Sequence, residues 1–298
     1  MSKGSLFWAN ASGKLGETVL YRSGGEQRTR TYVKKIKNPK TLAQMKNRLS
    51  MRNFAQIYRS LQPILSKSFP NRLAKESGFN AFVKANKSIR SAVVSEFGAK
   101  QGLSVPYNML MSQGYLTQFG EFKQLSWSGG VQGAGFDLSN HPNIEKIKEI
   151  WPVADDIDEY PTNAEGFAAM WDALQLPSTA KITVIFAEYM DEGYSLRSVS
   201  ATKENGFSVL MDNPWLLKMM TVTESGKTYP ALVFSDYSKE TMVTAIISWT
   251  DANGKLQVTN SRMVVPNADT TIPDDFVEGG FVYEQVLEAY GYNTDAAI

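Results

Sequence analysis

The chain has 298 residues, of which 43% are hydrophobic and 20% are charged, and it contains no cysteine. This size and composition fit a globular protein with a substantial core, most simply in two domains, and they exclude disulfide bonds and thiolate chemistry. The net charge of +1 hides a division. Residues 1–100 hold 20 Lys and Arg and 4 Asp and Glu, a net of +16, whereas residues 101–298 hold 11 and 26, a net of −15. Such halves favour a polyanionic partner for the first half, or an assembly in which the first half of one molecule meets the second half of another.

Residues 15–35 are predicted to form a β-hairpin. Leu15–Tyr21 is rich in β-forming residues, Ser23-Gly-Gly-Glu26 is typical of a turn, and Gln27–Lys35 alternates in character. Because side chains alternate across a strand, one face of the second strand would carry basic and aromatic groups together. These are Arg28, Arg30, Tyr32 and Lys34.

Two helices are predicted to follow the hairpin. Thr41 fits the N-cap of the first, apolar residues recur at three- and four-residue steps from Leu42 to Leu61, and Pro63 should kink or end it. The basic residues of this helix fall mainly off the apolar stripe; they are Lys46, Arg48, Arg52 and Arg59. A second helix is predicted over about 76–97.

From Val105 onward, short apolar runs alternate with turn signals such as Glu204-Asn-Gly206. This spacing predicts an antiparallel, immunoglobulin-like β-sandwich, with one helix near Phe167–Leu174 in an insertion over about 141–176. The predicted fold class is therefore α+β: a basic hairpin and helices, then the sandwich. We expect a basic module over 1–102 and an acidic sandwich over 103–298 that ends in a tail after 266.

Several segments carry a family resemblance. They are Gly13-Lys-Leu-Gly16, Lys37-Asn-Pro-Lys-Thr41 with Gln44 and Arg48, Phe79-Asn-Ala-Phe82 with Asn86, Val105–Leu116, and Ser248–Ser261. In this order, over roughly 13–265, they resemble a domain-of-unknown-function family of Bacteroidota and their phages and prophages. The Asn-Pro-x-Thr-x-x-Gln-x-x-x-Arg pattern is the most specific part. The resemblance implies a helical first half followed by a β-sandwich, and it supplies no activity and no catalytic residues. The chain departs from the pattern at 141–175 and after about 266.

The candidate nucleic-acid-binding residues lie in the hairpin and in the helix after it. Lys and Arg neutralise phosphates, a β-ribbon enters a groove, and Tyr stacks on bases. The set is Arg22, Arg28, Arg30, Tyr32, Lys34, Lys35, Lys37, Lys40, Lys46, Arg48, Arg52 and Arg59. The alternatives are a charged, solvated strand edge, an amphipathic helix whose polar side is basic, or a surface that docks on an acidic neighbour.

The sequence gives little indication of metal binding or catalysis. The acidic cluster Asp155, Asp156, Asp158 and Glu159 lacks the calcium-loop pattern, which favours a solvated loop or an acidic patch. His141 is the only histidine, and no nucleophile or orienting partner is marked for it. No Walker, zincin or Gly-x-Ser-x-Gly motif occurs. We therefore predict no catalytic residue, no metal and no cofactor.

Two functions fit these observations. The first is a non-enzymatic protein whose basic module contacts DNA or RNA phosphates without sequence specificity. The alternative is a structural protein of a phage virion or a similar particle, in which basic and acidic faces join subunits, including a homo-oligomer. The chain shows no signal peptide and no apolar run of membrane-spanning length, so we expect a cytoplasmic or virion-associated protein without a membrane partner.

Overall fold

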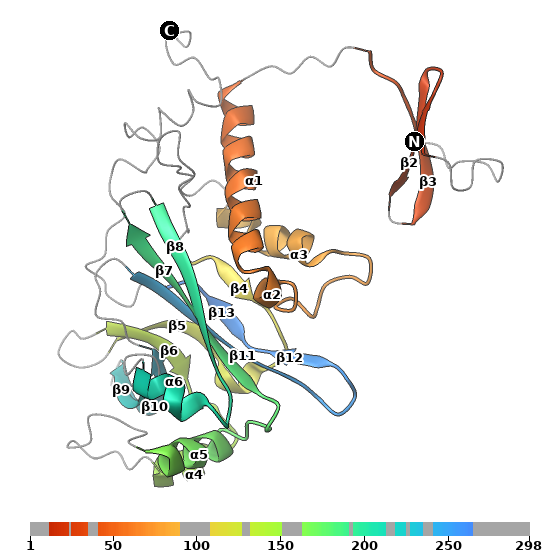
Figure 1. The fold of residues 1–298 in the computed structure, drawn as a ribbon. Coiled ribbons are helices and arrows are strands. Elements are labelled where there is room, and N and C mark those ends of the chain that lie inside the picture. The colour runs from red at the N-terminus through yellow and green to blue at the C-terminus, as the bar shows by residue number, and fades with distance from the viewer. Residues whose placement is uncertain are drawn as a thin grey trace. The chain divides into compact units, whose positions relative to one another are not determined.

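The computed structural model describes residues 12–23, 25–34, 41–89, 108–126, 132–150, 163–190, 193–212, 218–224, 227–234 and 241–264. The chain divides into two compact units, Met1–Thr41 and Leu42–Ile298. Helices, sheets of antiparallel strands and an N-terminal hairpin occur together, which confirms the predicted α+β class (Figure 1).

The first unit is a three-stranded antiparallel sheet, here called the hairpin unit. Its strands are β1 (Gly13–Leu15), β2 (Thr18–Ser23) and β3 (Glu26–Thr31), in the order β1-β2-β3. Ser23 pairs with Glu26, so two residues connect β2 to β3, as the Gly-Gly pair predicts. The prediction was wrong in one respect, because β3 ends at Thr31 and leaves Tyr32 and Lys34 beyond the strand.

The helices of the second unit begin and end where local chemistry dictates. They are α1 (Leu42–Ser60), α2 (Gln62–Leu65), α3 (Gly78–Ala85) and the short 3₁₀ helix η2 (Lys87–Ile89). Pro63 lies in the first turn of α2, where a missing N–H costs nothing. The Ser77 hydroxyl accepts a hydrogen bond from Asn80 N at 3.1 Å and so caps α3. The helix predicted over 76–97 thus ends at Ala85, and its last residues lie outside the described part of the chain.

The strands of this unit form two facing sheets. They are β4 (Leu110–Ser112), β5 (Glu121–Ser126), β6 (Gln132–Asp137), β7 (Lys181–Met190), β8 (Gly193–Ala201), β9 (Lys218–Glu224), β10 (Lys227–Phe234), β11 (Thr241–Thr250), β12 (Leu256–Val258) and β13 (Asn260–Arg262). The orders are β4-β13-β5-β6-β10-β9 and β12-β11-β7-β8. Strands β5-β6-β10-β9 and β12-β11-β7-β8 follow the A-B-E-D and G-F-C-C′ orders of an immunoglobulin-like sandwich. One pairing differs from the antiparallel prediction, because β13 runs parallel to β5.

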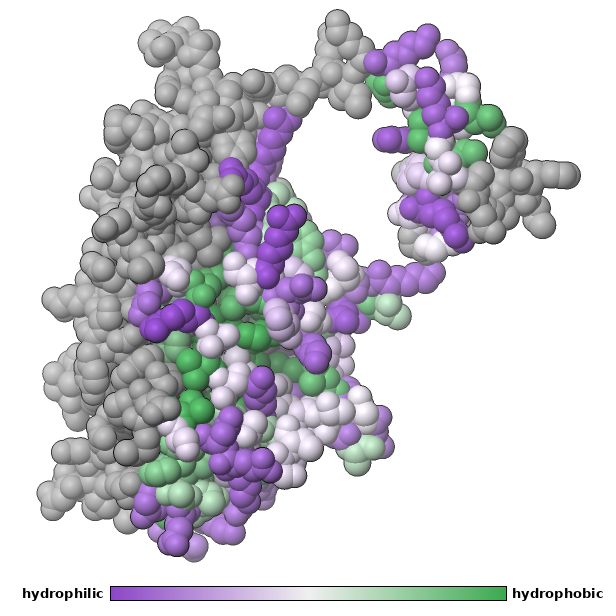
Figure 2. Space-filling view, in the orientation of Figure 1, coloured by the Kyte–Doolittle hydropathy of each residue, from purple (hydrophilic) through white to green (hydrophobic). Residues whose placement is uncertain are grey.

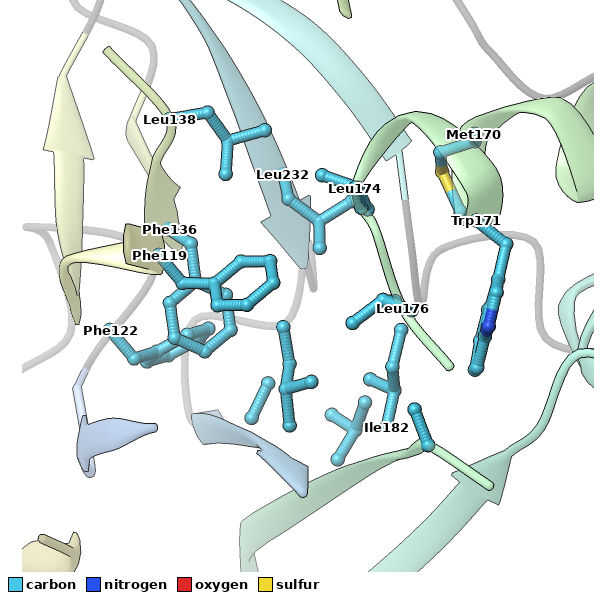
Figure 3. Packing of buried hydrophobic residues seen from close by; sticks show 14 of the residues in the cluster. Phe119, Phe122, Phe136, Leu138, Met170, Trp171, Leu174, Leu176, Ile182 and Leu232 are labelled. Carbon is cyan, nitrogen blue, oxygen red and sulfur yellow. The ribbon is translucent and has the colours of Figure 1, made fainter. Parts of the chain in front are cut away.

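The main core fills the space between the two sheets. Phe122, Phe136 and Leu232 from one sheet meet Ile182 and other apolar residues from the second (Figure 3). The α5 helix (Ala164–Ala173) of the insertion closes one end of this core and buries Trp171 completely. Asn163 caps this helix by accepting a hydrogen bond from Gly166 N at 2.7 Å. The helix predicted in the insertion is therefore present and extends the core.

The insertion also contains α4 (Ile144–Ile150), and two further short helices complete the second unit. These are η3 (Thr117–Phe119) and α6 (Gly206–Asp212). The Asn143 side chain donates a hydrogen bond to the Ala173 carbonyl at 2.7 Å, which ties the start of α4 to the end of α5.

A second core joins the helices to the outer face of the sheet β12-β11-β7-β8. Phe54, Ile57 and Phe82 cluster there with Ile185 and Met242. The helices α1–α3 therefore pack on the sandwich and share a core with it. The predicted boundary between residues 102 and 103 differs from the division at Thr41, because the apolar stripe of α1 finds its cover on the strands of the second half.

Candidate nucleic-acid interface

One face of the hairpin unit carries several of the predicted residues. Tyr21 lies opposite Arg28 and Val19 opposite Arg30, so these side chains share one face of the sheet. The Arg30 guanidinium carbon lies 5.8 Å from the centre of the Tyr21 ring. Arg28 lies 3.6 Å from a Glu26 carboxylate oxygen, which is an exposed ion pair of small energetic weight. The face presents two guanidinium groups beside an aromatic ring.

Lys14 belongs to the same face, although sequence reasoning missed it. It lies opposite Val19 in β1, and its ammonium nitrogen lies 3.8 Å from the centre of the Tyr32 ring. The Tyr32 backbone N–H donates a hydrogen bond to the Glu17 carbonyl at 2.5 Å. Tyr32 thus stays beside the sheet after β3 has ended. The hairpin prediction did not include β1, and only a prediction of this strand could have placed Lys14 on this face.

Arg22 lies on the opposite face of the hairpin unit. It is opposite Gln27 and alternates with Tyr21, so it points away from the face that holds Arg28. Both Arg22 and Lys34 are exposed. Basic side chains therefore occupy both faces of this sheet, and the predicted single basic face describes only part of them.

The arginines of α1 form a row. Arg48, Arg52 and Arg59 fall within about 40° of one another around the helix axis, at about 100° per residue. The buried residues Phe54 and Ile57 lie on the other side of the helix. Arg48 and Arg59 are exposed and Arg52 is half-buried. Figure 2 shows hydrophilic side chains along α1 and on the hairpin unit, while hydrophobic ones gather over the strands of the sandwich.

The basic residues of this region have no acidic neighbours along the sequence, although the whole chain carries a net charge of only +1. Between Glu26 and Glu76 the chain contains thirteen Lys and Arg and no Asp or Glu. Among the described residues of the hairpin unit, Arg28 with Glu26 is the one ion pair. The remaining predicted residues lie outside the description: Lys35, Lys37 and Lys40 entirely, and Lys46 in its side chain. The acidic cluster around Asp155 also lies outside it.

His141 has a structural position. It is 2% exposed, its Nδ1 accepts a hydrogen bond from Asn143 N at 3.2 Å, and its ring centre lies 5.2 Å from that of Phe119. Burial lowers the pKa of His141, and the nearby Leu174 backbone raises it by a smaller amount. Its Nε2 nevertheless lacks a partner with hydrogen-bond geometry. Across the described part of the chain, no three His, Asp or Glu side chains gather as metal ligands.

The geometry defines an α+β protein in which an immunoglobulin-like sandwich is covered by helices and accompanied by a basic hairpin unit. No family model, no curated protein and no solved structure gave a match to the chain. The described segments contain no helix with the length and apolar character needed to cross a membrane.

Proposed function

We propose that the protein binds nucleic acid without sequence specificity and without catalysis, through the hairpin unit and the arginine row of α1. The supporting observation is the run of thirteen basic residues without a carboxylate between Glu26 and Glu76. A local excess of positive charge attracts a polyanion, and neutralised phosphates release counterions. Tyr21 and Tyr32 add aromatic rings on which unpaired bases can stack. The described residues that we propose as contacts are Arg22, Arg28, Arg30 and Lys34 of the hairpin unit and Arg48, Arg52 and Arg59 of α1.

The test is fluorescence anisotropy of a labelled random duplex and a labelled single strand, titrated with the full-length protein at several salt concentrations. The logarithm of the affinity should fall linearly with that of the salt concentration, with a slope of about −0.9 for each phosphate contacted on a duplex. Arg22→Gln with Arg30→Gln should flatten the slope by about one to two.

The matched control removes the same charge elsewhere. Lys146→Gln with Lys203→Gln lowers the net charge equally, at an exposed site on α4 and at a half-buried site after β8. This control should keep the wild-type slope. Equal losses in both variants would show that net charge alone governs binding, and no binding by the wild type would overturn the proposal.

The alternative is a structural protein of a phage virion or similar particle. The observation that favours it is the opposite charge of residues 1–100 and 101–298, +16 against −15, which lets one copy contact the next. Light scattering separates the two functions. A salt-sensitive oligomer with no affinity for either labelled strand would support assembly in place of nucleic-acid binding.

A further inference from the structure

Two adjoining hollows lie beside α2, on the outer side of the sheet β12-β11-β7-β8. They have volumes of about 380 and 370 Å³ and share Lys67 and Leu256. We call them together the α2 groove. It lies wholly within the second unit of the chain.

The lining of the α2 groove follows from where the helix layer ends. Along β7, Ile185 and Ala187 are buried under the helices, whereas Lys181 and Thr183 lie nearer the start of the strand and line the groove. Along β11, Met242 is likewise buried under the helices, whereas Ser248 and Thr250 lie nearer the end of the strand and line the groove. The sheet face that forms the floor also carries the apolar residues Ile246, Leu256 and Val258. The floor therefore combines apolar and hydroxyl side chains, since Thr183 lies opposite Ile246.

Four basic side chains line the α2 groove. Lys67, Lys181, Arg72 and Lys255 are all exposed. The Arg72 guanidinium donates a hydrogen bond to the Ser66 carbonyl at 2.8 Å, and the Lys255 ammonium lies 3.5 Å from the centre of the Tyr115 ring. The described residues that line the groove include no carboxylate, and none of the four cations forms an ion pair within the described part of the chain. The groove is therefore suited to a ligand that is both acidic and apolar.

Residues 265–298 of the same chain have this character. They contain seven Asp and Glu, no Lys or Arg, and five aromatic residues. Segments with one sign of charge often serve as interaction segments. We propose that the acidic segment 265–298 docks in the α2 groove of its own chain, with its carboxylates on the groove lysines and its apolar side chains on the floor. This inference does not depend on the proposed function.

The attachment point of the segment supports docking within one chain. Val264 exchanges hydrogen bonds with Val243 of β11, the strand that also supplies Ser248 to the groove. Five residues along a strand span about 17 Å. Fewer than ten extended residues therefore bridge the distance. Tethering also gives the segment an effective concentration of the order of millimolar. A free polyanion lacks this advantage of tethering.

The experiment is zero-length carbodiimide cross-linking of the full-length protein, which joins lysines to carboxylates in contact. An equal mixture of ¹⁵N-labelled and unlabelled protein is used, and the linked peptides are identified by mass spectrometry. We expect links from Lys67, Lys181 or Lys255 to Asp274, Asp275 or Glu278 within copies of one isotope. Absence of such links would overturn docking within one chain, and so would linked peptides of which about half carry mixed isotopes, as links between copies of a 1:1 mixture must.

Hydrogen exchange of residues 265–298 provides a second readout. The variant Lys67→Gln with Lys181→Gln and Lys255→Gln should lose the protection of this segment. The matched control, Lys146→Gln with Lys148→Gln and Lys203→Gln, should keep it. Unchanged protection in the groove variant would contradict the proposal. If that variant instead lost affinity for the labelled nucleic acids, the groove would belong to the nucleic acid and not to the segment.

Discussion

The two units of the chain hold their structure in different ways. The hairpin unit, Met1–Thr41, has nine Lys and Arg against two Glu, and among its described side chains Leu20 alone is buried. In the unit Leu42–Ile298, the central sheet β12-β11-β7-β8 is buried on both faces. One face packs against the opposing sheet and the other against α1–α3. The first unit is therefore mostly surface, and the second supplies the main stabilising core.

The boundary between the compact units and the boundary between the basic and acidic parts of the sequence lie at different residues. The charge changes sign near residue 100, whereas the compact units meet at Thr41. The helices α1–α3 belong to the basic half by composition and to the sandwich by contact, because their apolar sides need the strands. A fragment that ended near residue 102 would strip these helices of the surface they cover. Deletion of the sandwich is therefore not a suitable test of the basic residues.

The largest expected effect comes from the core between helices and sheet. Phe82 is fully buried, and its ring centre lies 5.8 Å from that of Phe54 in an edge-to-face arrangement. Phe82→Ala should lower the free energy of unfolding by about 3–5 kcal/mol, because it removes apolar contacts and leaves a cavity. Chemical denaturation followed by circular dichroism measures the loss.

The same experiment tests whether helices and sandwich are one cooperative body. Strands and helices of Leu42–Ile298 should lose structure in a single transition in both proteins. Leu73→Ala, at a side chain 70% exposed, is the control and should change stability by less than about 0.5 kcal/mol. Two separate transitions would contradict the shared core.

The sequence predicted local features better than contacts between them. The Gly-Gly pair and Pro63 located the turn of the hairpin and the end of α1, because each acts through nearby backbone. The cover on both faces of the central sheet was missed. Its signal was present in Ile182–Ala187 and Met242–Ile247, which are nearly continuous apolar runs, typical of strands buried on both sides.

The candidate site was predictable only as a set of residues. The charge bias identified Arg22, Arg28 and Arg30. Which face of the sheet each side chain occupies depends on the register between β2 and β3, and the two-residue turn sets that register. Lys14 was missed because β1 is only three residues long and has little pattern to detect. The α2 groove could not be predicted at all, since Lys67, Lys181 and Lys255 come together only through tertiary packing.

Asn86 should give the next largest effect. It is buried, its Oδ1 accepts a hydrogen bond from Leu110 N at 2.7 Å, and its Nδ2 donates to the Leu110 carbonyl at 2.9 Å. Asn86→Ala should cost about 1–3 kcal/mol of unfolding free energy, because buried backbone groups of β4 lose their partner. Asn80→Ala at an exposed position of α3 is the control. Equal stability of both variants would contradict the role of Asn86 as the link between α3 and β4.

A pair of glycines compares the two units directly. Gly25 in the hairpin unit has φ 81° and Gly254 in the β11–β12 turn has φ 76°, with no atom within 4 Å of an added Cβ in either case. Each Gly→Ala substitution should therefore cost about 1 kcal/mol of backbone strain. Gly254→Ala should lower the Tm of the large unit, whereas Gly25→Ala should leave it unchanged and speed hydrogen exchange of the hairpin amides. A lower Tm in both variants would mean that the two units unfold together.

The smallest effect is a pH dependence within the large unit. Burial lowers the pKa of His141 below its ordinary 6.5, so the unfolded chain binds a proton at a higher pH than the folded protein does. The stability contributed by neutral His141 is then complete above about pH 6.5 and declines as the pH falls below that value, by at most about 1.4 kcal/mol per pH unit. His141→Asn keeps an acceptor for Asn143 N and removes the titration. The difference in Tm between wild type and variant should therefore be constant above pH 6.5. Below pH 6.5 the Tm of the wild type should fall relative to that of the variant.

An NMR titration gives the pKa directly. Because His141 is the only histidine, its titration reports this pKa without ambiguity, and a midpoint at or above 6.5 would contradict the prediction.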